Sequence, residues 1–78
     1  MKGVLEFNLD DGEDRIAHLR AVKSTDLALT IHEMDEYLRG RLKHGDLSDP
    51  QHYEVFGIRE KLNELLLNYN ICLDELLR

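Results

Sequence analysis

The densest group of side chains that could do chemistry is the run HEMDE at residues 32–36. His32 and Glu36 are four residues apart, so both lie on one face of a helix, as two metal ligands on a helix would. A metal site needs further ligands at a matching spacing. The chain offers none, because its remaining histidines are scattered over predicted helix ends and loops: His18, His44 and His52. We therefore expect an exposed acidic face and no metal site.

Two pairs of carboxylates have the spacing for general acid–base work, Glu33 with Glu36 and Asp10 with Asp11. Such work needs a concave, water-poor pocket that shifts their pKa values. A core built from 78 residues leaves little room for one. Cys72 has no nearby histidine or basic flank, so we expect a small buried apolar residue rather than a nucleophile. We expect no catalytic residue, no cofactor and no enzyme; a small enzyme is the weakest alternative.

One basic and aromatic patch is present, formed by Tyr37, Arg39 and Arg41 and followed by Lys43 and His44. Arg59 joins it if the helices that carry these residues are antiparallel. The guanidinium group of arginine can donate two hydrogen bonds to one anionic group. We therefore predict candidate binding residues for an anionic nucleotide held between subunits: Tyr37, Arg39, Arg41 and Arg59. The simpler interpretation is that the cations stabilise a helix C-terminus.

The total charge limits the partners of the chain. Ten Lys and Arg residues against sixteen Asp and Glu residues give a net charge of −6. This charge disfavours nucleic-acid backbone and anionic lipid as partners, since both need a basic face. A single cysteine excludes an internal disulfide. No stretch resembles a signal peptide or approaches the ~20 apolar residues of a membrane span, so we expect a cytoplasmic protein.

The central helix is predicted over residues 25–44, after a break at residues 23–26 where Ser24 or Thr25 serves as cap. Its apolar residues share one narrow stripe and are expected in the core: Leu27, Ile31, Met34, Leu38 and Leu42. Asp35 precedes Arg39 by four residues, which predicts an exposed ion pair. Gly45 is the predicted left-handed C-cap. A separate short helix is predicted from Asp11, as cap, to about Val22.

The third helix is predicted from Pro50 to Asn68 or Tyr69. Ser48 and Gln51 have the spacing of a capping box, and Asn70 is the expected C-cap. Its predicted core stripe is Val55, Ile58, Leu62, Leu65 and Tyr69, widened by Leu66. The tail ICLDELLR predicts a helical turn docked by its leucines. Residues 3–9, GVLEFNL, alternate as a strand does and either pair with a second copy or lie over the helices as an extended arm.

Apolar residues also occur outside these stripes. Leu29 and Gly40 lie off the stripe of the central helix, and an interior glycine suggests close approach by another backbone. Phe56 and Leu67 lie on a second face of the third helix. Contacts with another copy would explain both faces, so we expect a homodimer or a higher oligomer. The candidate partner-binding residues are Leu29, Glu33, Glu36, Gly40, Phe56 and Leu67.

Four segments carry a family resemblance: FNL at 7–9, EMDEYLR at 33–39, LKHG at 42–45 and IREKLNELL at 58–66. Through them the chain resembles a group of small phage-encoded helical proteins. The resemblance implies an accessory protein that binds a host protein and modulates or inhibits it. It transfers no functional residues to this chain.

Taken together, the patterns predict one mostly all-α domain over residues 1–78. It is a three-helix, bundle-like fold with a short N-terminal strand or arm and a C-terminal helical turn. The leading functional prediction is a non-enzymatic protein that binds another protein. The alternative is an oligomer that sequesters an anionic nucleotide between its subunits.

Overall fold

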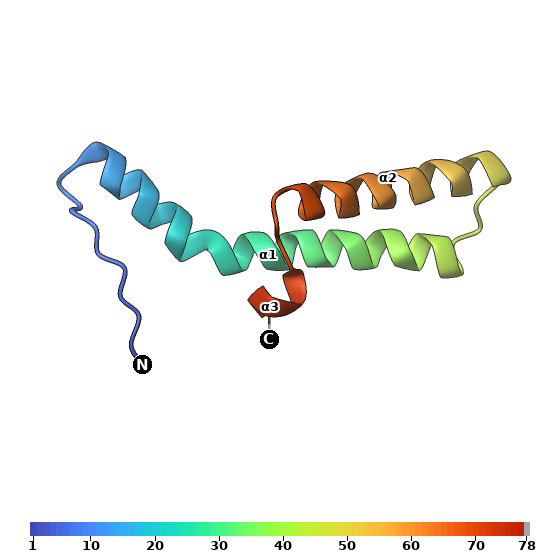
Figure 1. The fold of residues 1–78 in the computed structure, drawn as a ribbon. Coiled ribbons are helices and arrows are strands. Elements are labelled where there is room, and N and C mark those ends of the chain that lie inside the picture. The colour runs from blue at the N-terminus through green and yellow to red at the C-terminus, as the bar shows by residue number, and fades with distance from the viewer. Residues whose placement is uncertain (78) are drawn as a thin grey trace.

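The computed structural model describes residues 1–77, and this part of the chain contains three helices and no strand. Helix α1 covers Gly12–His44, α2 covers Asp49–Asn68 and α3 covers Leu73–Leu77. The C-terminal part of α1 and the whole of α2 form an antiparallel hairpin, and α3 packs against α1 after the chain crosses it (Figure 1). The all-α prediction is therefore confirmed for these residues.

The N-terminal segment, which we call the arm, is extended and runs away from α1 toward the N terminus, and it contacts the start of α1 through Phe7 and Asn8 (Figure 1). Residues 3–9 form no strand in the single chain, and Val4 and Leu5 are exposed rather than laid over the helices. The Phe7 ring meets the His18 ring edge-on at 5.5 Å. The Asn8 backbone N–H donates to the Asp14 carboxylate at 2.9 Å. Asp11 is the N-cap, as predicted, and its carboxylate accepts from the Asp14 backbone N–H.

The predicted break at residues 23–26 is wrong, because α1 is continuous through it. The residues that signal a helix start satisfy their side chains within the helix instead. The Ser24 hydroxyl donates to the Ala21 carbonyl, and Lys23 pairs with Asp26 at 3.7 Å. Hydroxyl bonds of this kind bend helices rather than end them. Figure 1 shows the corresponding bend in the teal part of α1, between residues 20 and 30.

Local signals predict the two turns except at the C-caps, where Tyr69 caps α2 in place of the predicted Asn70 and Gly45 adopts another conformation than predicted. Ser48 and Gln51 form the expected capping box at the start of α2. Asn70 has a φ of 55°, and the Asn70 and Ile71 backbone N–H groups donate to Leu67 and Leu66. These bonds form the left-handed motif that ends many helices. Gly45, in contrast, is extended, with φ −75° and ψ 145°, so its predicted left-handed conformation is wrong.

On each helix of the hairpin, the face that is buried differs by a rotation about the helix axis from the apolar stripe that the sequence predicted. On α1 only Ala28 and Leu38 are buried, at 3% and 9% exposure, with Ile31, Asp35 and Leu42 half-buried. On α2 the inward residues are Val55, Arg59, Leu62 and Leu66. The predicted core residues that instead lie exposed are Leu27, Met34, Ile58, Leu65 and Tyr69. Each helix has one neighbour along most of its length, so only part of a wide apolar stripe can be covered.

The chain is elongated, and the predicted bundle does not form. Its radius of gyration is 17.3 Å, against about 11–12 Å for a compact domain of this length. Its accessible surface is 6991 Å², against about 4,900 Å² for a compact protein of its mass. Helix α1 is about 50 Å long and α2 about 30 Å, so the N-terminal third of α1 extends beyond the hairpin. We call residues 12–23 the overhang.

Candidate interaction surfaces

The hairpin is joined by a two-point ion pair between its helices. Arg59 Nε donates to Asp35 Oδ1 at 2.9 Å, and Arg59 Nη2 donates to Asp35 Oδ2 at 3.4 Å. The hydrogen bond to Asp35 raises the pKa of the Arg59 guanidinium and outweighs the desolvation that lowers it. The predicted pair of Asp35 with Arg39 is therefore wrong: Arg39 pairs with Glu36 at 3.8 Å. The antiparallel arrangement of these two helices is confirmed by the contact.

The four candidate partner residues on α1 share its outward face. Leu29, Glu33, Glu36 and Gly40 fall within a narrow arc of the helix, on the side away from α2. Leu29 is 43% exposed. Nothing lies within 4 Å of a Cβ built on Gly40, so the close backbone approach that this glycine suggested does not occur within the chain. Phe56 and Leu67 are exposed on α2 and belong to a different surface.

The four candidate nucleotide ligands do not converge within one chain. Tyr37 and Arg41 line a hollow of 350 Å³ with Gly40 and His44. Arg39 is two residues from Arg41 and therefore points to nearly the opposite side of α1. Arg59 donates to Asp35 through two of its nitrogens. One arginine, Arg41, is thus left beside the tyrosine.

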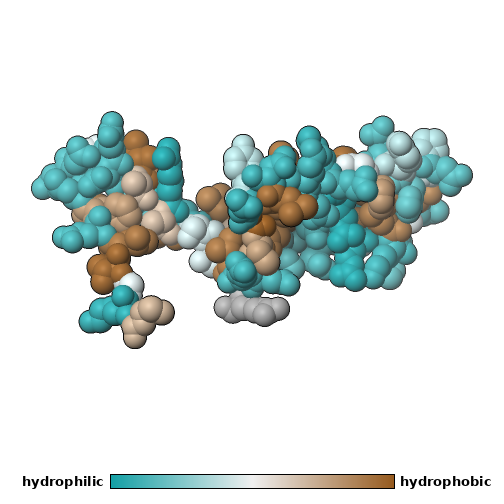
Figure 2. All heavy atoms as spheres, viewed as in Figure 1, coloured by the Kyte–Doolittle hydropathy of each residue, from teal (hydrophilic) through white to brown (hydrophobic). Residues whose placement is uncertain are grey.

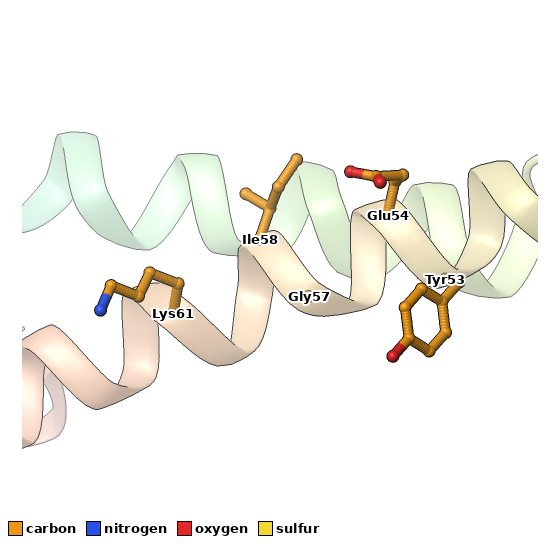
Figure 3. Close-up of a pocket in the computed structure, with 5 residues that line it drawn as sticks. All are labelled: Tyr53, Glu54, Gly57, Ile58 and Lys61. Carbon is orange, nitrogen blue, oxygen red and sulfur yellow. The ribbon is translucent and has the colours of Figure 1, made fainter.

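A second hollow, of 270 Å³, is lined by residues of α2 around Gly57. Figure 3 shows the residues that line it. Ile58 and Glu54 point to one side of the helix and Tyr53 to the other, so the polar groups do not aim at a common point. No polar or charged side chain is buried among residues 1–77.

Exposed apolar side chains also lie along one side of the hairpin. Leu27 and Met34 on α1 are 59% and 54% exposed, and Ile58 and Leu65 on α2 are 53% and 42% exposed. Each pair is displaced from the buried side of its helix in the same rotational sense, by about 60–90°. In antiparallel helices this places all four residues on the same side. We call this set the hairpin face.

The hairpin face continues in two directions. Leu27 also lines a groove of 310 Å³ between α1 and α3, whose other apolar walls include Ile31, Ile71 and Leu76. Ile16, on the overhang, lies 18 residues before Met34, which is five full helical turns, so both point the same way. Ile16 and Leu19 are more than half exposed. Figure 2 shows apolar side chains gathered over the overhang and arm and again around α3.

The residues of the hairpin face have a recognisable spacing in the sequence, but the sequence prediction places them in the core. Met34 follows Leu27 by seven residues, and Leu65 follows Ile58 by seven residues. This spacing is typical of apolar residues at a contact between two helices. A single neighbouring helix covers only one narrow seam, so these residues stay exposed beside the seam that the hairpin buries. Cys72, predicted to be buried, is exposed.

Three further properties bear on the function of the described residues: a metal site, a membrane-spanning helix and similarity to known proteins. Residues 1–77 contain no group of three or more His, Cys, Asp or Glu side chains placed to hold a metal ion. Within the same residues, every helix is too short or too polar to cross a membrane. No family model, curated protein or solved structure matches this chain. The arrangement of its own residues therefore carries the functional argument.

Proposed function

We propose that the chain is a non-enzymatic accessory protein, of the phage type, that binds another protein and modulates or inhibits it. One observation carries this proposal: most large apolar side chains lie on the outside, while Ala28 and Leu38 are the only buried residues among 1–77. Exposed apolar surface of this extent is typical of a protein that binds another molecule through it. In the hollow over Gly57, the polar side chains of Tyr53 and Glu54 point to different sides of α2, which supports binding over catalysis there.

The outward face of α1 is the surface we assign to the foreign partner. Leu29 supplies an apolar contact, and Glu33 and Glu36 flank it with negative charge. The chain as a whole carries a net charge of −6, which attracts a basic surface and accelerates encounter with it. The partner we propose is therefore a host protein with a basic patch around an apolar socket.

The test is capture from a bacterial lysate by the tagged full chain, repeated with two charge-reversed forms. Glu33→Lys with Glu36→Lys reverses the proposed face. Glu54→Lys with Glu60→Lys makes the same change in net charge on α2 and serves as the matched control. We expect the first form to lose captured protein by about tenfold or more and the control to retain it. Equal capture by the two forms would contradict the assignment of this face.

A further inference from the structure

We propose that a second copy of this chain covers the hairpin face, and that the overhang of each copy packs on the hairpin of the other. Two surfaces of one chain need covering, and they complement each other. The overhang is a helix of about three turns with exposed Ile16 and Leu19 and no neighbouring helix in its own chain. The hairpin presents Leu27, Met34, Ile58 and Leu65 as exposed side chains, with Leu27 at the edge of the groove beside α3.

The area supports a dimer of the obligate kind. Each chain exposes about 2,000 Å² more than a compact protein of its mass. Covering this excess on both copies would bury about 4,000 Å² in total, which is within the range of permanent homodimers. A small transient contact would leave most of the excess in water. The excess therefore matches one large interface shared by two copies.

A second copy fits this face better than a foreign protein does. Most of the stability of a helix in a protein comes from packing, so a neighbouring helix on the overhang would stabilise it whenever the protein is folded. Only another copy is always present where the chain is made. The geometry is also self-complementary, because Ile16 and Met34 lie nine residues on either side of Thr25, on the same side of α1 by helical count. A two-fold axis near Thr25, in the bend of α1, brings Ile16 of each copy onto Met34 of the other.

The first test is sedimentation equilibrium of the purified full chain. We expect twice the chain mass of 9.1 kDa. Met34→Glu with Ile58→Glu should weaken the dimer by about a hundredfold or more, because these charges would be buried in the interface. Leu29→Glu with Leu67→Glu is the matched control, since it makes the same chemical change off the hairpin face, and it should leave the mass unchanged. A monomeric wild-type chain would overturn the proposal.

The second test keeps the apolar surface nearly intact, so it does not depend on whether the Glu variants fold. In a Cys72→Ser background, chains with Ile16→Cys are mixed with chains with Met34→Cys and oxidised. We expect the mixed disulfide to dominate, because like positions in the proposed dimer are about 27 Å apart and cannot bridge. Replacing Met34→Cys by Leu67→Cys, off the face, should abolish this preference. The same yield for both mixtures would overturn the two-fold arrangement while leaving the foreign-partner proposal intact.

Discussion

The hairpin and the overhang share one helix, α1, yet they are held in different ways. In the hairpin, α1 has a neighbour, buries Leu38 and Ala28, and is tied to α2 through Asp35 and Arg59. In the overhang, the same helix contacts the arm, through the rings of Phe7 and His18 and the bond from Asn8 to Asp14. The comparison shows that a continuous helix need not be uniformly stable, because packing rather than helix propensity supplies most of its stability.

The comparison also assigns different roles to similar apolar residues. Leu38 and Leu19 are both leucines on α1, at 9% and 57% exposure. The first stabilises the fold of the single chain. The second contributes only when another molecule covers it. Substitutions of apolar residues in the overhang should therefore affect assembly, while substitutions of apolar residues inside the hairpin should affect the stability of the single chain.

The largest expected effect comes from Leu38→Ala, compared with Leu19→Ala. Removing the buried Leu38 side chain should lower the free energy of unfolding by about 2–4 kcal/mol. Leu19→Ala should cost little in dilute solution and more as the protein concentration rises, because a second copy then covers the site. Urea denaturation followed by circular dichroism, at several protein concentrations, measures both. A large and concentration-independent cost for Leu19→Ala would break the comparison.

An intermediate effect is expected at the two helix N-caps. Ser48→Ala removes half of the capping box of α2 and should lower the global free energy of unfolding by about 1 kcal/mol. Asp11→Ala removes the same kind of cap from the overhang. It should change global stability by less than half as much and instead speed amide exchange in the first turn of α1. Amide hydrogen exchange by NMR separates the two responses, and equal global losses would show that the overhang unfolds with the hairpin.

The smallest expected effect is the coupling between Asp35 and Arg59. A double-mutant cycle with Asp35→Ala and Arg59→Ala should give about 1 kcal/mol, since the pair is two-point but still partly exposed. The raised pKa of Arg59 means that its contribution is fully present at neutral pH and is lost only in strong alkali. Glu36 and Arg39, a more exposed pair at 3.8 Å, form the control cycle and should couple by less than about 0.5 kcal/mol. If the two cycles gave equal coupling energies, the pair of Asp35 with Arg59 would contribute no more to the hairpin than an ordinary surface ion pair.

Much of the local structure could be predicted from the sequence. The caps at Asp11 and Ser48, the left-handed Asn70 and the extent of α2 all follow from side-chain bonds and backbone preferences that act within about four residues. The same local rules failed at residues 23–26, where Ser24 bonds back to Ala21 and the helix continues. A cap signal and a bend signal use the same residue types, so the local pattern alone does not separate them.

The sequence by itself determined that the chain is helical, where α2 begins and ends, and that its apolar residues exceed what one narrow stripe needs. Only the tertiary structure decided which of those residues face inward. Pairing Asp35 with Arg59 across an antiparallel hairpin brings Ala28 and Leu66 to the buried side and leaves Leu27, Met34, Ile58 and Leu65 outside. The physical reason is that helical periodicity defines a face only to within a wide arc, and the position of the neighbouring helix selects the part of that arc that is buried.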